Sequence, residues 1–286
     1  MTIGVDLGGT HIRAGIDQRG QISKPKKELF RTTASLSQTL DQFTEFIRPL
    51  VSSGGRGIGI GVPSVVDVEK GIVYNVANIP SWIEVPLKEI LEEEFKIPVR
   101  VNNDVNCFIL GEHRYGMAKG FRNVVGISCG TGLGAGIIIN GELYSGSNCG
   151  AGEIGLLHYL DHNIEYYASG NLFSACFNTT AETAHQLALQ GDEGAKESWR
   201  LFGGHLAEAI KSVVLTYDPE AIVLGGSLSK AFGLFSAAMQ SSLKDFPYPK
   251  SIEKLKIYAS RNPDISLLGA AALCGRNNAQ QRNSGT

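Results

Sequence analysis

The sequence predicts an α/β protein that contains a duplicated unit. In the main pattern, two apolar strands with alternating small residues flank a turn of glycine and threonine. The first copy covers Ile3–Ile16 and the second covers Val124–Ile139, and a shift of 122 residues places Gly8 on Gly130. Because the two copies occupy comparable places in the two halves of the chain, they indicate a duplicated domain.

The composition limits the class of protein. Of the 286 residues, 43% are hydrophobic and 19% are charged, which is typical of a globular protein rather than a disordered one. The 26 basic and 28 acidic residues give a net charge of −2, which argues against a nucleic-acid or anionic-membrane partner. The five cysteines form no CxxC pair, and the sequence shows no signal-peptide pattern and no apolar run long enough to cross a bilayer. We therefore expect a cytoplasmic protein.

In the first half, strands and helices alternate. After the opening hairpin, apolar residues at helical spacing predict a helix over Leu36–Leu50. A buried strand is expected at Ile58–Val62, and Pro86 can open a short helix. The next strand, Val99–Val101, leads directly into Asn102–Asp104, so these polar side chains are predicted at a strand end.

The second half begins with the repeated hairpin and continues mainly as helices. Asn140-Gly141 is a strong signal for a further hairpin turn. Helical segments are expected as far as Tyr217, and Ala221–Leu224 is a short buried strand that ends in Gly225-Gly226. Ile265–Leu273 is predicted to be the last helix.

The two turns of glycine and threonine are candidate phosphate sites. Gly130–Ala135 formally matches the dinucleotide fingerprint GxGxxA, but a strand follows it where that fingerprint requires a helix. The sequence contains no GxxxxGK[ST] motif either. Backbone N–H groups and threonine hydroxyls in such turns can hold phosphate oxygens. The alternative is that both turns are merely tight hairpins, and their matched positions favour phosphate contact.

Carboxylates follow two of the predicted strands. Asp6 could hold Mg²⁺ through water beside a phosphate, or could cap its own turn. Asp104 begins a helix, where aspartate is a common N-cap, and the helix N-terminus would keep it ionised. An ionised Asp104 could accept the proton of an attacking hydroxyl. Asn102 and Asn103 beside it offer amides to sugar hydroxyls.

Three further features have a functional and a structural interpretation. Glu153 lies among small residues, which suggests a carboxylate held in a close-packed loop, although it could also be a solvated turn residue. A metal cluster is disfavoured because no cysteine joins its candidate ligands, which are His158, Asp161, His162 and Glu165. Cys129 has no histidine partner in the sequence and is interpreted as a small buried residue.

Four segments in this order resemble the ROK family of sugar kinases: VDLGGTHIRAGI, NNDVNCFILGE, GTGLGAGIIINGELYSG and GAGEIG. The resemblance extends from Met1 to about Cys274, and the NND and GTGxGxG motifs together are specific. It implies the actin-like ATPase fold, which is ribonuclease-H-like, with two α/β domains around a cleft. We expect a small domain over residues 1–115, completed by the C-terminal helix within 264–275. A larger domain would cover 116–263 and a flexible tail 276–286.

The resemblance implies ATP- and Mg²⁺-dependent phosphorylation of a hexose hydroxyl, with glucose as the default sugar. Asp104 matches the catalytic base of the family. The positions that match its sugar contacts are Asn78, Asn103, Asp104, Glu153 and Glu165. The positions that match its nucleotide-contacting loops are Gly8, Gly9, Thr10, Gly130, Thr131, Gly132, Gly225 and Gly226.

The chain also departs from the family pattern. The family often binds a structural zinc with CxCGxxGCxE, but the corresponding stretch Gly155–Glu165 contains no cysteine, so we predict no zinc site. Leu156 stands where the family has a histidine that usually touches the sugar, and His158 could replace it. Ser64 stands where the family usually has glycine, and its hydroxyl could reshape the sugar pocket.

Three alternatives to a glucose kinase remain. The first is an N-acetylmannosamine or N-acetylglucosamine kinase of amino-sugar breakdown. The second, a ROK-type sugar-responsive repressor, is disfavoured because the first strand is expected at Thr2, which leaves no room for a DNA-binding segment before it. The third is a non-catalytic sugar-binding or assembly protein, against which the presence of Asp104 and both turns argues. By resemblance we also expect a homodimer.

Overall fold

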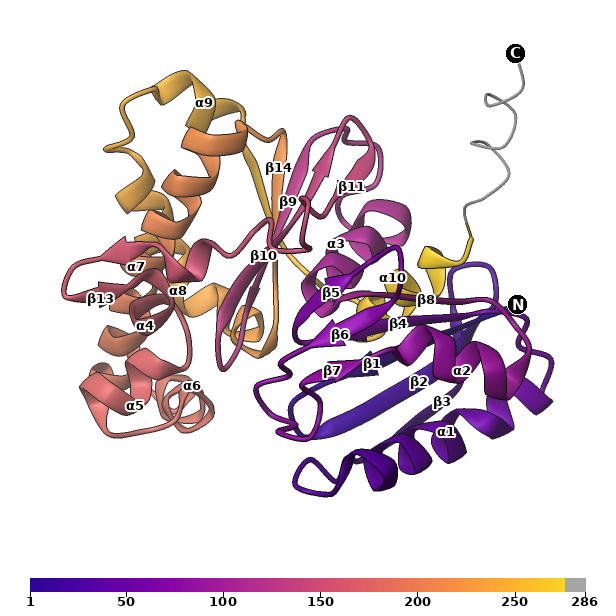
Figure 1. Cartoon of the computed structure of the whole chain (residues 1–286). Coiled ribbons are helices and arrows are strands. Elements are labelled where there is room, and N and C mark those ends of the chain that lie inside the picture. The colour runs from indigo at the N-terminus through magenta and orange to yellow at the C-terminus, as the bar shows by residue number, and fades with distance from the viewer. Residues whose placement is uncertain (276–286) are drawn as a thin grey trace, which may run out of the picture. The chain divides into compact units, whose positions relative to one another are not determined.

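The computed structural model describes residues 1–275 and confirms the α/β class (Figure 1). The chain separates into two compact units. Unit 1 contains residues 1–119, 143–151 and the segment from Asn262 onward, and unit 2 contains residues 120–142 and 152–261. Residues 143–151 therefore pack with unit 1, although the sequence analysis counted them in the second domain. The expected flexible tail, 276–286, lies outside the described residues.

The central sheet of unit 1 has the strand order β3-β2-β1-β4-β8. Its antiparallel part is β1 (Thr2–Leu7), β2 (His11–Asp17) and β3 (Ile22–Leu29). Strands β4 (Ile58–Val62) and β8 (Val99–Asn103) continue it in parallel with β1. The predicted opening hairpin is confirmed, whereas β3 was not predicted. This edge strand is largely exposed and contains a proline and three lysines, so it lacks an alternating apolar pattern.

The second five-stranded sheet, whose strands lie in unit 2 except for residues 143 and 144 of β11, repeats this topology in the order β11-β10-β9-β14-β15. Its strands are β9 (Val124–Cys129), β10 (Leu133–Ile139), β11 (Glu142–Tyr144), β14 (Ala221–Gly225) and β15 (Lys256–Ala259). Strands β9 and β10 are antiparallel, and β14 is parallel to both β9 and β15. The register places Ser128 opposite Gly134, as Asp6 lies opposite Arg13 in unit 1. The duplication that the sequence predicts is thus confirmed in the strand order.

Among the described residues, unit 1 contains the helices α1 (Leu36–Ser52), α2 (Leu87–Phe95), α3 (Asp104–Tyr115) and α10 (Ile265–Leu273). Helix α10 packs directly on β1 and α3 (Figure 1). Its approach is so close that a Cβ atom on Gly269 would lie 1.7 Å from the carbonyl oxygen of Cys107, and one on Gly4 would lie 1.9 Å from that of Leu267. Glycines at these contacts therefore allow the last helix of the chain to complete the first unit.

A small antiparallel sheet follows β4, and it consists of β5 (Val65–Asp67), β6 (Ile72–Tyr74) and β7 (Glu84–Val85). In the segment between β6 and β7, Trp82 is fully buried, packs against Phe30 and Phe43, and donates a hydrogen bond of 2.8 Å to Thr39 Oγ1. This buried contact fixes the segment that carries Asn78.

Unit 2 is predominantly helical outside its sheet. Its helices are α4 (Ile164–Ala168), α5 (Asn171–Phe177), α6 (Ala181–Leu189), α7 (Glu193–Tyr217), α8 (Phe232–Leu243) and α9 (Pro249–Lys254). Two short 3₁₀ turns, η1 (Ile154–Leu156) and η2 (Ser227–Ala231), and the hairpin β12 (His158–Tyr159) with β13 (His162–Asn163) complete it. The core joins Phe173, Trp199, Phe202 and Phe235 in mutual ring contacts.

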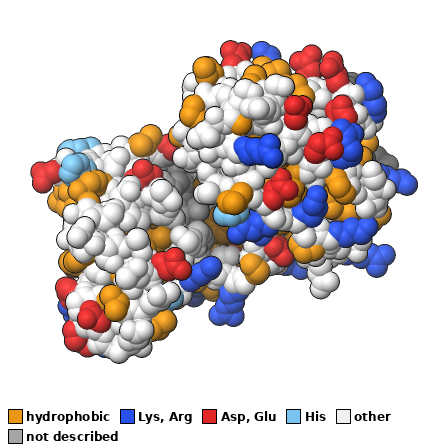
Figure 2. Space-filling model, turned by 90° about the horizontal axis from the view of Figure 1, so that it is seen from below, with side chains coloured by type: hydrophobic (Ala, Val, Ile, Leu, Met, Phe, Trp, Pro, Cys, Tyr) orange, Lys and Arg blue, Asp and Glu red, His pale blue; other side chains and the backbone are white. Residues whose placement is uncertain are grey.

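Acidic and basic side chains are interspersed on the face shown in Figure 2, in keeping with the near-neutral net charge. Within residues 1–275, no helix is both long and apolar enough to cross a membrane.

Candidate active site

Asp104 stands at the junction of β8 and α3. Asn103 precedes the helix in an extended conformation, and its Oδ1 accepts hydrogen bonds from the N–H groups of Val105 (2.8 Å) and Asn106 (3.3 Å). Asn103 is therefore the N-cap, and the N-cap position considered for Asp104 is wrong. Asp104 is the first helical residue, is half-buried, and accepts a hydrogen bond of 2.9 Å from the N–H of Val105. The helix N-terminus stabilises an ionised carboxylate there.

Asn102 has a structural role behind this motif. It is buried, and its Oδ1 accepts hydrogen bonds from the N–H of Asn103 (2.8 Å), from Asn106 Nδ2 (2.9 Å) and from the thiol of Cys149 (3.3 Å). These three partners engage the amide oxygen of Asn102, and a contact of its amide with a sugar hydroxyl stays a prediction. The contacts connect residues 143–149 to the start of α3.

The first turn of glycine and threonine lies beside Asp6 and Asn78. The N–H of Gly8 donates to the carbonyl of His11 at 2.9 Å, which closes the turn. A Cβ atom on Gly9 would lie 2.7 Å from Asn78 Nδ2, so glycine here allows the amide of Asn78 to approach the turn. Within unit 1, the structure thus brings a predicted sugar contact next to a predicted phosphate turn.

Asp6 is paired with a residue that the sequence analysis missed. Its Oδ2 lies 3.7 Å from the guanidinium of Arg13, which also forms an ion pair of 2.7 Å with Asp264. Burial raises the pKa of the Asp6 carboxyl, and Arg13 acts in the opposite direction. The sequence signal that could have revealed this pair is the hairpin itself. Its register places Arg13 on β2 opposite Asp6 on β1.

The second turn is held by Glu165. The N–H of Gly130 donates to the carbonyl of Gly132 at 2.9 Å, which closes the turn as in the first copy. Glu165 Oε2 accepts a hydrogen bond of 2.8 Å from the N–H of Leu133. A Cβ atom on Gly132 would lie 2.6 Å from the same carboxylate oxygen. Glu165 is therefore a structural partner of the turn, a role that the sequence analysis did not predict.

Glu153 and Glu165 are two carboxylates within unit 2 that interact electrostatically. Glu153 directly precedes η1. The residue as a whole is exposed, yet partial burial of its carboxyl group raises the pKa, and the negative charge of Glu165 raises it further. Two interacting carboxylates can accept hydrogen bonds from adjacent sugar hydroxyls, which is the chemistry expected of both residues.

Gly225 and Gly226 lie where β14 ends, in unit 2. Gly226 has φ +79°, and a Cβ atom there would lie 2.1 Å from the carbonyl oxygen of Cys129, so only glycine fits this position. Beside it, a cavity of about 380 Å³ is lined by α6, η2 and the ring of Trp199. Its volume is within the range of small-molecule sites.

The residues at the departures from the family pattern differ in their surroundings. Leu156 is 66% exposed. His158 is also exposed, and its Nδ1 lies 3.0 Å from the carbonyl oxygen of His162 within the β12–β13 hairpin. The hydroxyl of Ser64 donates a hydrogen bond to the carbonyl of Tyr74. Cys129 is buried, as predicted, and burial raises the pKa of its thiol to about 12.

The described residues 1–275 contain no group of three or more histidine, cysteine, aspartate or glutamate side chains placed to hold a metal ion. Mg²⁺ in phosphoryl-transfer sites typically uses one or two carboxylates together with phosphate oxygens and water. Asp6, a single carboxylate next to a predicted phosphate turn, fits that requirement.

The comparisons with known proteins identify the family. A family model described as the ROK family matches residues 2–277, and the chain belongs to this family. A glucokinase of Thermotoga maritima is 28% identical, over 95% of this chain and 96% of that protein. An N-acetyl-D-glucosamine kinase of Shigella boydii is 30% identical, over 80% of this chain and 84% of that protein.

The solved structures agree on the fold. The structure of a ROK family glucokinase from Streptomyces griseus, in complex with glucose and AMPPNP, has a TM-score of 0.83 and 28% identity, and covers 96% of this chain and 99% of that one. This neighbour is a ROK sugar kinase with the actin-like ATPase fold, which confirms the predicted fold class. The family also contains repressors. A xylose repressor of Bacillus spizizenii is 28% identical over 86% of this chain and 66% of its own length.

Proposed function

We propose that this protein is an ATP- and Mg²⁺-dependent hexose kinase, with glucose as its default acceptor and Asp104 as its general base. The observation that carries the proposal is the half-buried carboxylate of Asp104 in the first turn of α3, fixed by the Asn103 cap. Similarity to sugar kinases along nearly the whole chain supports it.

In the proposed reaction, Asp104 accepts the proton of the sugar hydroxyl while the hydroxyl oxygen attacks the γ-phosphorus. A new P–O bond forms to the sugar, the bond to the bridging oxygen breaks, and ADP leaves. Asn78 and Asn103 in unit 1, and Glu153 and Glu165 in unit 2, would orient the sugar through its other hydroxyls. Such positioning accounts for much of the rate enhancement in phosphoryl transfer.

The nucleotide would be bound by the two turns and the β14 end. Residues 8–10 and 130–132 would contact phosphate oxygens, and Gly225-Gly226 with the 380 Å³ cavity would take the nucleoside. Bound Mg²⁺, held through water by Asp6, would neutralise charge on the phosphates. For assembly and location we propose a cytoplasmic homodimer, which light scattering coupled to gel filtration and cell fractionation would test.

The alternative acceptor is N-acetylmannosamine or N-acetylglucosamine. The similarity of this chain to an N-acetyl-D-glucosamine kinase supports this alternative. Glucose differs from these N-acetylated sugars in the substituent on C2. A panel of sugars therefore distinguishes a glucose kinase from an N-acetylhexosamine kinase directly.

The test is ADP release from Mg-ATP with glucose, mannose, fructose, allose, N-acetylglucosamine and N-acetylmannosamine. Asp104→Asn should lower kcat by about 10²–10⁴-fold, because it removes the proton acceptor. The control is Asp41→Asn, which changes an exposed aspartate on α1. No turnover of any sugar, together with calorimetric sugar binding, would instead favour a repressor or a non-catalytic sugar-binding protein.

A further inference from the structure

Ser64 lies in the short link between β4 and β5, and each of its polar groups has a partner in unit 1. Its backbone N–H donates at 2.9 Å to the carbonyl of Val62. Its hydroxyl donates to the carbonyl of Tyr74 on β6, and its own carbonyl accepts a hydrogen bond of 3.3 Å from Asn103 Nδ2. Ser64 therefore connects the β5–β6 hairpin to the residue that caps α3.

These bonds allow the side-chain amide of Asn103 one orientation. Its Oδ1 accepts from two backbone N–H groups at the start of α3, and such groups can only donate. The carbonyl of Ser64 can only accept, so Nδ2 has to face it. A flipped amide would lose all three hydrogen bonds. The link to Ser64 thus contributes to fixing the cap of α3.

The position of Asp104 depends on this cap. The N–H of Val105 donates both to Asn103 Oδ1, at 2.8 Å, and to Asp104 Oδ1, at 2.9 Å. A rotation of the Asn103 side chain would therefore disturb the same N–H that holds the proposed base. A general base has to lie within hydrogen-bond reach of the attacking hydroxyl, so a small displacement of its carboxylate lowers the rate.

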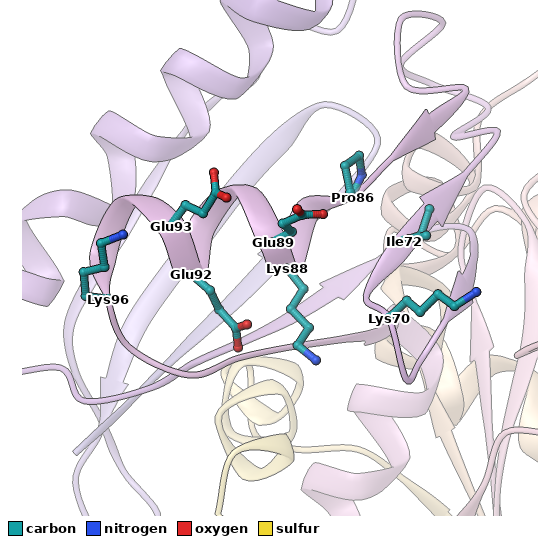
Figure 3. Close-up of a pocket in the computed structure, with 8 residues that line it drawn as sticks. All are labelled: Lys70, Ile72, Pro86, Lys88, Glu89, Glu92, Glu93 and Lys96. Carbon is teal, nitrogen blue, oxygen red and sulfur yellow. The ribbon is translucent and has the colours of Figure 1, made fainter.

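The hairpin that receives the Ser64 hydroxyl is anchored on its other side. Figure 3 shows Lys88 on α2, next to the β5–β6 hairpin. Lys88 Nζ donates at 3.1 Å to the carbonyl of Glu69, and its backbone N–H donates at 3.2 Å to that of Gly71. Because α2 holds the turn between β5 and β6, the hairpin offers Ser64 a fixed point of attachment.

We propose that Ser64 is a positioning residue for phosphoryl transfer, and that it acts through Asn103 on Asp104. The inference rests on the proposed kinase function. It differs from the direct effect on the sugar pocket considered from the sequence, because the Ser64 hydroxyl is bonded to the backbone of β6. The family usually has glycine at this position, and glycine would keep the carbonyl but lack the hydroxyl. The attachment to β6 is therefore a feature of this chain.

The first experiment compares Ser64→Ala with Ser23→Ala in ADP release at saturating sugar. Ser23 is the matched control, because its hydroxyl also donates to a backbone carbonyl in unit 1, that of Ile16 at 3.2 Å. Ser64→Ala should lower kcat by about 3–10-fold, as expected for the loss of one hydrogen bond, and Ser23→Ala should leave kcat unchanged. Both variants should lose unfolding free energy to a similar extent. Ser64→Thr retains a hydroxyl and should recover most of the activity.

A double-mutant cycle tests whether the effect passes through Asn103. Asn103→Ser keeps a hydroxyl that can cap α3 but removes the amide N–H that reaches Ser64. In that background, Ser64→Ala should change kcat by less than about 1.5-fold. Additive effects of the two substitutions would reject this route from Ser64 to Asp104.

An NMR spectrum of the side-chain amides gives a readout that does not depend on turnover. The signals of Asn103 are identified by their loss in Asn103→Ser. They should move in Ser64→Ala and stay in place in Ser23→Ala. Unmoved signals in Ser64→Ala would reject the link between Ser64 and Asn103.

The remaining outcomes separate the inference from the proposed function. Moved Asn103 signals with an unchanged kcat in Ser64→Ala would reject the positioning role and leave the kinase intact. A higher KM for sugar at unchanged kcat would make Ser64 a substrate contact instead. No turnover of any sugar would reject the kinase, and the positioning role with it.

Discussion

Glu165 accepts a hydrogen bond of 2.8 Å from the backbone N–H of Leu133. This contact joins a predicted sugar-binding carboxylate to the predicted phosphate turn 130–132, within unit 2. A single side chain is therefore placed to influence the binding of both proposed substrates.

Two substitutions at Glu165 separate its roles. Glu165→Gln keeps an acceptor oxygen for Leu133, so it should raise the KM for sugar while leaving the KM for ATP within about twofold. Glu165→Ala removes the acceptor and should raise both KM values, by about tenfold for ATP, since a hydrogen bond to a charged group contributes about 1.5–3 kcal/mol. Steady-state kinetics for each substrate would measure this, and equal effects of the two variants on ATP would contradict the turn-holding role.

Acid should weaken sugar binding through Glu153. Burial and the charge of Glu165 raise the pKa of Glu153, so its carboxylate becomes protonated at a higher pH than an ordinary glutamate. A protonated carboxyl accepts hydrogen bonds less well, so the KM for sugar should rise as the pH falls through that pKa. In Glu165→Gln the neighbouring charge is absent, and the same rise should occur at lower pH. The KM for sugar, measured across the acidic pH range, would reveal this shift. Identical pH profiles for the wild-type protein and Glu165→Gln would refute the interaction between Glu153 and Glu165.

We expect the ionised Asp6 carboxylate to lower the stability of the folded protein at neutral pH, although the same residue contributes to the proposed catalytic function. Because burial raises its pKa in the folded state, the stability contributed by this group is present at low pH and is lost as the pH rises through that pKa. Asp6→Asn should therefore raise the Tm of the nucleotide-free protein at neutral pH, with the difference vanishing in acid. Arg13 keeps Asp264 as a partner at 2.7 Å, so the substitution leaves no unpaired cation.

The same variant should lose activity. If Asp6 contacts Mg²⁺ through water, Asp6→Asn should lower activity by about 10–100-fold, with partial recovery at high Mg²⁺. Thermal unfolding at several pH values and a Mg²⁺ titration of ADP release would check both parts. A lower Tm at pH 7, or full activity at limiting Mg²⁺, would count against this description of Asp6.

Helix α10 should tolerate no side chain where it crosses α3. Gly269→Ala would place a Cβ atom 1.7 Å from a backbone oxygen, which cannot be relieved by a rotamer change, so we expect a loss of more than about 3 kcal/mol. Gly233→Ala in α8 is the matched control, because a Cβ atom there meets nothing within 4 Å. It should be neutral or add about 0.5 kcal/mol. Chemical denaturation would measure both, and similar unfolding free energies would contradict the tight contact.

Features that depend on a local residue pattern could be predicted from the amino-acid sequence alone. Alternating strands around two turns predicted both hairpins, and the recurrence of the turn after 122 residues, from Gly8 to Gly130, predicted a duplicated domain. The strand orders of the two five-stranded sheets confirm that duplication. Helical spacing predicted α1, α3 and α10. These predictions succeed because strand and helix periods are set by the backbone within a few residues. Strands β3 and β15 were missed because neither has a clear apolar alternation.

Which polar side chains form hydrogen bonds that hold the fold became evident from the packing of distant segments. Asn102 and Asn103 are neighbours with the same side chain, yet one is buried in a hydrogen-bond network and the other caps α3. Glu165 reaches Leu133 across 32 residues, and Asn106 reaches Ser145 across 39. Hydrogen bonds over such separations depend on how distant segments pack together, and no local period of the chain encodes them.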